Sequence, residues 1–151
     1  MPSAAHTVLF SAFDRHNLGD LLFAHVLARM LALRALLFAG LATRDLRAFG
    51  GHRVHAITEI AANDKPVDII HAGGELLTCD AWEATVMLSP PEHVQSVIAQ
   101  QSAWEADPLE WSRTHLGRAT RAPYVLSKSA LPELRIRRIV FHAMGGASLA
   151  P

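Results

Sequence analysis

Short apolar runs alternate with polar turns along this sequence. Residues 7–12 (TVLFSA) form a first run rich in strand-forming residues, and 35–39 (ALLFA) form a second that is apolar without interruption. An uninterrupted apolar run is typical of a strand whose two faces are both covered by helices, as in parallel sheets. The pattern therefore predicts an α/β fold with a mainly parallel open sheet flanked by helices.

A helix is predicted between these two strands. Gly19-Asp20 opens it, and the apolar side chains that follow recur with 3.6-residue spacing to about Leu33 without an internal Gly or Pro. Asp20 is well placed to cap this helix, because its carboxylate can accept hydrogen bonds from the first-turn N–H groups. The chain is thus expected to begin with a strand, a polar turn and a helix.

The same alternation continues through the middle of the chain. Pro90-Pro91 must separate two helices, because proline lacks a backbone donor and disfavours helical geometry in the residue before it. The further elements predicted are strands over 52–57, 67–72 and 137–142, the last of them buried, helices over 81–88 and 92–104, and a loop-rich stretch with short helical pieces over 105–132.

Length and charge limit the classes of function. The 151 residues are expected to form a single α/β domain over 1–151. Lys and Arg together number 14, as do Asp and Glu, so no net field attracts nucleic acid or an anionic membrane surface. Charged residues divide the most apolar window, 18–42, which argues against a membrane span. A lone cysteine, Cys79, excludes an internal disulfide and agrees with a cytoplasmic location.

Glycine-rich turns are predicted to follow three of the strands. In an open parallel sheet the carboxyl ends of the strands form the crevice where ligands bind, and glycine there lets backbone amides approach closely. Ordinary turns and caps use the same residues, so each site alone has that second explanation. Together they predict these substrate-binding residues: Asn17, Gly19, Gly73, Gly74, Glu75, Gly145 and Gly146.

Two side chains in the first turn are candidate catalytic residues. His16 can act as a general base near neutral pH, and Asp20 suits a sugar hydroxyl better than a phosphate because its charge would repel an anion. Glu75 can accept hydrogen bonds from hydroxyls or cap the helix that begins near Asp80. No metal site is predicted, since no HExxH or Cys/His spacing occurs, and the common nucleotide-binding and serine-hydrolase motifs are missing.

Two segments together resemble a known family. His16-Asn17-Leu18-Gly19-Asp20 after the first strand, followed by the segment 71–77 (HAGGELL), resembles the N-terminal half of polysaccharide pyruvyl transferases. The resemblance implies a Rossmann-like half of a glycosyltransferase-B-like fold. It also implies transfer of pyruvate from phosphoenolpyruvate to two hydroxyls of a sugar or glycan acceptor as a cyclic ketal, without a further cofactor.

The same resemblance implies that the chain is the N-terminal half of a longer two-domain enzyme. Family members are longer, and their donor-binding cations are expected in a second domain, so this chain should be inactive alone. The alternative is a non-catalytic Rossmann-like module that binds a metabolite or oligomerises. If the module oligomerises, the surface left by the missing C-terminal domain is buried in a homodimer or against a separate partner.

Overall fold

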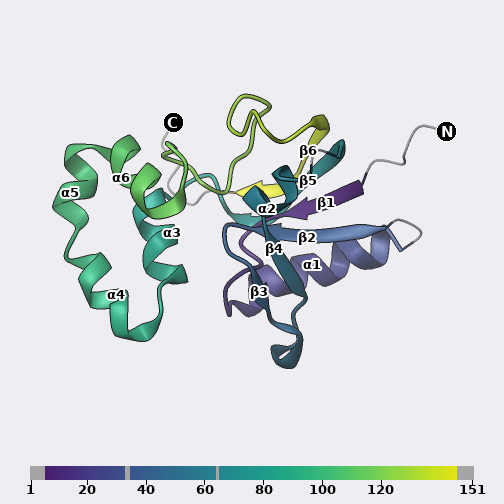
Figure 1. Cartoon of the computed structure of the whole chain (residues 1–151). Coiled ribbons are helices and arrows are strands. Elements are labelled where there is room, and N and C mark those ends of the chain that lie inside the picture. Colours follow the sequence, from purple (N-terminus) through teal and green to yellow (C-terminus); the bar gives the residue numbers. More distant parts are fainter. Residues whose placement is uncertain (1–5, 33–34, 64, 146–151) are drawn as a thin grey trace.

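The computed structural model describes residues 6–32, 35–63 and 65–145 and contains a six-stranded sheet in the order β3-β4-β2-β1-β5-β6 (Figure 1). The strands are β1 (His6–Phe10), β2 (Leu36–Gly40), β3 (Arg44–Asp45), β4 (Arg53–Ala56), β5 (Val67–Glu75) and β6 (Ile136–Gly145). All neighbours pair in parallel except β3 and β4, which pair antiparallel. The predicted α/β class and the mainly parallel sheet are confirmed.

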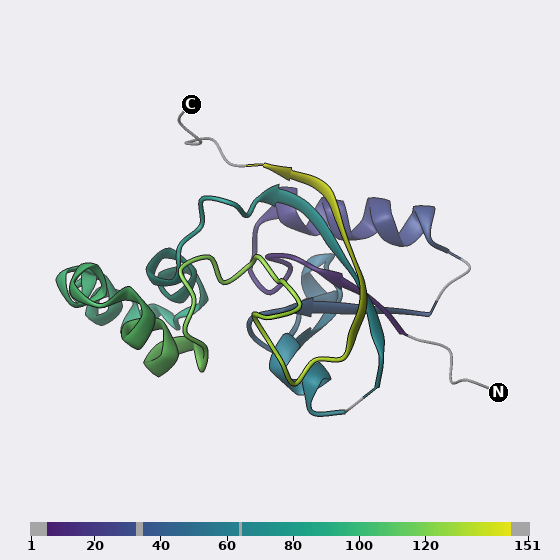
Figure 2. The same ribbon diagram turned by 90° about the horizontal axis from the view of Figure 1, so that it is seen from above.

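Helices cover both faces of the sheet and extend beyond its carboxyl edge. The helices are α1 (Leu18–Met30), α2 (Ile57–Ala61), α3 (Ala81–Leu88), α4 (Pro91–Ile98), α5 (Gln101–Ala106) and α6 (Pro108–Leu116), with a 3-10 turn η1 (Arg47–Phe49). The four helices α3 to α6 form an arm beyond the carboxyl ends of the strands (Figures 1 and 2). Among the described residues, no helix is long and apolar enough to cross a bilayer.

The central position of β1 in the sheet explains why its side chains are apolar on both faces. Val8 and Phe10 pack against α2 and the segment 118–135, whereas Leu9 between them packs against α1. All three side chains are fully buried. Successive strand residues point to opposite faces, so a strand with helices above and below needs apolar residues at every position.

Several predicted boundaries are wrong. β5 was expected to stop before Gly73, but its pairing with β6 continues through Glu75. The predicted strand 52–57 is one residue shorter at each end, because β4 begins at Arg53 and Ile57 begins α2. The predicted helix 92–104 is two helices, since the Gln100 N–H donates to the Val97 carbonyl and this tighter turn ends α4. In the stretch predicted to be loop-rich with short helical pieces, α6 is such a piece.

The last strand is not buried, contrary to its prediction. β6 pairs only with β5 among the described residues and forms an edge of the sheet (Figure 2). Its apolar residues Val140 and Phe141 are 49% and 57% exposed. The apolar run predicted a buried strand, but burial depends on strand order, and strand order depends on pairings between distant segments that local composition does not encode.

A buried histidine fastens the segment 118–135 to the sheet. His71 in β5 is fully buried, and its Nε2 accepts a hydrogen bond from the Leu126 N–H (2.9 Å). Nε2 is therefore unprotonated, and the neutral ring carries its proton on Nδ1. Burial lowers the pKa of His71 to about 4, so the ring is neutral near pH 7.

This buried ring makes stability depend on pH. The pKa of His71 is about 4 in the folded chain against 6.5 when exposed, so its contribution is complete above pH 6.5 and is lost as the pH falls toward 4. We expect a loss of about 3 kcal/mol across that window. Urea unfolding of wild type and His71→Gln at several pH values tests this, because Gln can accept the Leu126 bond without titrating. Parallel pH profiles would contradict it.

Candidate functional site

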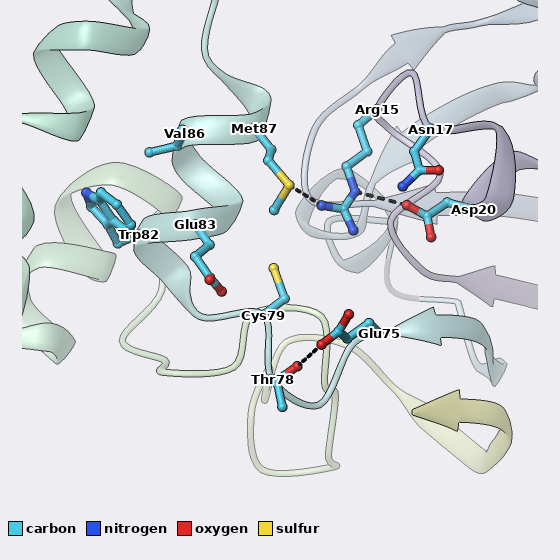
Figure 3. A pocket seen from close by; sticks show the side chains of 10 residues that line it. All are labelled: Arg15, Asn17, Asp20, Glu75, Thr78, Cys79, Trp82, Glu83, Val86 and Met87. Atoms are coloured by element: carbon cyan, nitrogen blue, oxygen red, sulfur yellow. Dashed lines mark hydrogen bonds and ion pairs between the residues drawn. The ribbon is translucent and has the colours of Figure 1, made fainter. Parts of the chain in front are cut away.

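A cavity of about 520 Å³ lies between the carboxyl edge of the sheet and helix α3 (Figure 3). We call it the acidic cavity. It is lined by Arg15, Asn17, Asp20, Glu75, Thr78, Cys79, Trp82, Glu83, Val86 and Met87. Three of these residues are carboxylates and one is a cation, so an incoming ligand meets an excess of negative charge. The β1–α1 turn, the end of β5 and α3 supply its walls.

The start of α1 places Asn17 and Asp20 at this cavity. The Asn17 side chain caps the helix by accepting a hydrogen bond from the Gly19 N–H (3.0 Å). The prediction that Asp20 is the cap is therefore wrong, because the helix begins two residues earlier, at Leu18. Asp20 lies within the first turn, and its buried carboxylate reaches Arg15 Nε at 3.2 Å instead.

Arg15 connects the sheet edge to α3. Its guanidinium pairs with Asp20 on one side and donates to the Met87 sulfur on the other (Figure 3). It also lies over the Tyr124 ring, 5.6 Å from the ring centroid. Burial raises the pKa of Asp20, and the attraction of Arg15 offsets only part of that effect. The result is a buried carboxylate that accepts a proton more readily than an ordinary aspartate.

The predicted Gly73-Gly74 site lies next to α1. Both glycines have left-handed backbone, with φ of 67° and 83°. A Cβ on Gly74 would lie 3.0 Å from Asp20 Oδ1, and one on Gly73 would lie 2.3 Å from the Phe23 ring. These glycines therefore make room for α1 side chains. Neither Gly73 nor Gly74 lines the acidic cavity.

The other predicted binding residues lie at the same edge of the sheet. Glu75 lines the acidic cavity and accepts a hydrogen bond from the Thr78 hydroxyl (3.0 Å). It does not cap α3, because Asp80 and Glu83 do so in a reciprocal capping box. Gly145 pairs with Glu75 at the end of β6 but does not line the cavity, and Gly146 falls outside the described residues.

His16 faces a different part of the cleft. It is exposed, its ring meets Phe49 edge-on at 4.6 Å, and it lines a second cavity beyond Arg15. The acidic cavity does not include it. The two predicted catalytic residues, His16 and Asp20, are therefore placed in different cavities, although they are only four residues apart in sequence.

Sequence reasoning missed several residues of the acidic cavity. Arg15 precedes His16 in the turn after β1, so the rule for strand ends would have included it. The α3 residues Trp82, Glu83 and Met87 gave no comparable signal, because no local pattern shows where the helical arm meets the sheet. Cys79 is buried, and burial raises its pKa to about 12, so its thiol stays protonated and is a poor nucleophile.

Neither known proteins nor a metal centre identify this site. No protein-family model, no curated protein and no solved structure matches the chain. Over the described residues, His, Cys, Asp and Glu form no group of three or more that could hold a metal ion. The resemblance to pyruvyl transferases therefore stays a prediction, and a function has to be inferred from the residues that line the cavity.

Proposed function

We propose that the acidic cavity binds a sugar or glycan and that the chain is the acceptor-binding half of a pyruvyl transferase-like enzyme. The observation that carries this proposal is the set of carboxylates Asp20, Glu75 and Glu83 around one cavity. Carboxylates accept hydrogen bonds from sugar hydroxyls and repel phosphate. Arg15, the one cation lining the cavity in the described chain, is already paired with Asp20.

Asp20 is the base in this proposal. Ketal formation needs two sugar hydroxyls to bond to the enol carbon of phosphoenolpyruvate while that carbon loses phosphate and the neighbouring methylene takes a proton. A carboxylate whose pKa is raised by burial is a better acceptor for a hydroxyl proton than an ordinary one. His16 faces the other cavity, so we do not retain it as the base for a hydroxyl bound beside Asp20.

The remaining chemistry belongs to groups outside this cavity. An acid must protonate the methylene carbon, and cations must stabilise the departing phosphate. We propose that a second domain, in the same polypeptide or on a partner, supplies the acid opposite the carboxyl edge of the sheet. The fold expected for the complete enzyme is glycosyltransferase-B-like, with this chain as its Rossmann-like half.

Sugar binding is expected to depend on the cavity carboxylates. Asp20→Asn and Glu75→Gln should each weaken binding of the best sugar in a panel of methyl glycosides by roughly tenfold, because a charged hydrogen-bond acceptor becomes neutral. Saturation-transfer NMR and titration provide the measurement. Glu133→Gln is the matched control, since Glu133 is exposed and lies outside the cavity. Equal affinity in all four proteins, or no sugar bound by wild type, would contradict the proposal.

The alternative of an oligomerising module has its own support. The outward face of α1 carries Leu18, Leu22, Val26 and Met30, which are all exposed. Since Leu21, Ala24 and Leu27 of the same helix are already buried in the fold, this second set of apolar side chains is available for a protein contact. If this face is the functional one, light scattering will report a stable dimer that Leu22→Glu converts to monomer, and the panel of sugars will not bind.

A further inference from the structure

A second cavity of about 520 Å³ lies on the other side of the contact between Arg15 and Met87. We call it the basic cavity. It is lined by Asp14, Arg15, His16, Asn17, Arg44, Met87, Leu88, Ser89, Pro90 and Pro91. Arg15, Asn17 and Met87 line both cavities, so they form the wall that divides one cleft into two compartments.

The charge of this compartment is opposite to that of its neighbour. Arg44 supplies a guanidinium group and His16 supplies an imidazole, whereas the Arg15 guanidinium in the shared wall is already paired with Asp20. Among the described residues, the only carboxylate in its lining is Asp14. Both Asp14 oxygens already accept hydrogen bonds, Oδ1 from the Tyr124 hydroxyl and Oδ2 from the backbone N–H of Leu41 and Ala42. The cation that a ligand in this compartment can pair with is therefore Arg44.

Arg44 is held in place by a backbone contact, and no described residue gives it an anionic partner. Its Nη2 donates to the Leu88 carbonyl at the end of α3 (2.7 Å), and this bond uses one of the five N–H donors of the guanidinium. The residue is half-buried, and within the described residues no carboxylate forms an ion pair with it. Partial desolvation of a charge has a cost, and an anion bound at Arg44 would offset it.

We propose that the basic cavity binds a small oxyanion, a phosphate or carboxylate group, with Arg44 as its principal contact. Guanidinium groups match the geometry of both anions and bind them through two parallel N–H bonds. The cleft would then hold hydroxyl groups beside Asp20 and an anionic group beside Arg44, with Arg15 between them. Oxyanion binding itself is independent of the acidic cavity; only its role beside a sugar rests on the proposed function.

The test is a titration of the whole chain at constant ionic strength with inorganic phosphate and, separately, with pyruvate. Arg44→Gln should weaken binding of at least one anion about tenfold or more, because a charge-assisted pair is lost. Arg53→Gln is the matched control, since Arg53 is an exposed arginine of the neighbouring strand β4 and lies outside the cavity. Comparison of the two probes shows whether phosphate or carboxylate is preferred.

A second variant tests the basic cavity in case Arg44→Gln does not fold. His16→Asp adds a carboxylate to the basic cavity at an exposed position and leaves Arg44 intact, so it should also weaken oxyanion binding by repulsion. Equal losses of anion affinity in Arg44→Gln and Arg53→Gln would overturn the proposal. So would the absence of binding by wild type at anion concentrations of about 10 mM. Sugar binding that survives in these variants separates this failure from a failure of the acidic cavity.

Discussion

Replacement of Gly73 by alanine should lower the free energy of unfolding by about 3 kcal/mol. Gly73 has a φ of 67°, which costs a residue with a Cβ roughly 1 kcal/mol. The added Cβ would also lie 2.3 Å from the Phe23 ring, closer than any real contact, so α1 must move or the ring must leave its position. Overpacking of this kind adds about 1–3 kcal/mol. Urea unfolding measures the sum.

Gly50 provides the matched control for this substitution. Its φ of 77° is similar, but no atom of the described residues beyond its chain neighbours lies within 4 Å of a Cβ added there. Gly50→Ala therefore reports the backbone term alone and should cost only about 1 kcal/mol. Shortening Phe23 to Leu should recover part of the loss in Gly73→Ala, because it removes ring atoms from the site of the clash. Equal losses in the two alanine variants would show that Phe23 has no part in the effect.

The Gly73-Gly74 pair shows how far local sequence reasoning reaches. The pair was correctly placed near the carboxyl edge of the sheet, because an apolar strand run precedes it. The sequence could not distinguish a ligand from a helix as the group that comes close to these glycines. Phe23 and Asp20 are about fifty residues away in the chain, and only the packing of α1 on β5 brings them to Gly73 and Gly74.

The strands and the first helix were predictable because their signals are local. Apolar runs identified β1, β2 and β5, and periodicity identified α1. Two features were not predictable, because both depend on contacts between distant segments. They are the exposed edge position of β6 and the place where α3 to α6 contact the edge of the sheet. The site divides in the same way. The β1–α1 turn was found, and the helix over 81–88 was predicted, but the contribution of that helix and of Arg44 to the two cavities was missed.

Asp14→Ala is expected to be the second strongly destabilising change, with a loss of about 4 kcal/mol. The side chain is 2% exposed, and three donors point to it: the Tyr124 hydroxyl (2.9 Å) and the backbone N–H groups of Leu41 (2.6 Å) and Ala42 (2.9 Å). Gly40 leaves the space that this carboxylate occupies, since a Cβ there would lie 2.5 Å from Asp14 Oδ2. Removal of the carboxylate leaves these donors without their acceptor.

Tyr124→Phe separates the tyrosine bond from the rest. It removes one donor and leaves the two backbone bonds to Asp14, so it should cost only about 1 kcal/mol. The double variant lacks the unpaired hydroxyl, so its loss of unfolding free energy should be smaller than the sum of the losses in the two single variants. A double-mutant cycle in urea would detect the difference. A loss below 1 kcal/mol in Asp14→Ala would mean that water replaces the carboxylate for all three donors.

The effect of Asp14 should extend to binding, because the residues that divide the cleft follow it directly. Arg15 and Asn17 belong to the turn that the Asp14 hydrogen bonds fix against β2, and Tyr124 contacts both Asp14 and Arg15. Asp14→Ala should therefore weaken sugar and oxyanion binding together, measured well below its midpoint of unfolding. Asp20→Asn and Arg44→Gln should each affect one compartment. Loss of one ligand alone in Asp14→Ala would show that the two cavities do not share this support.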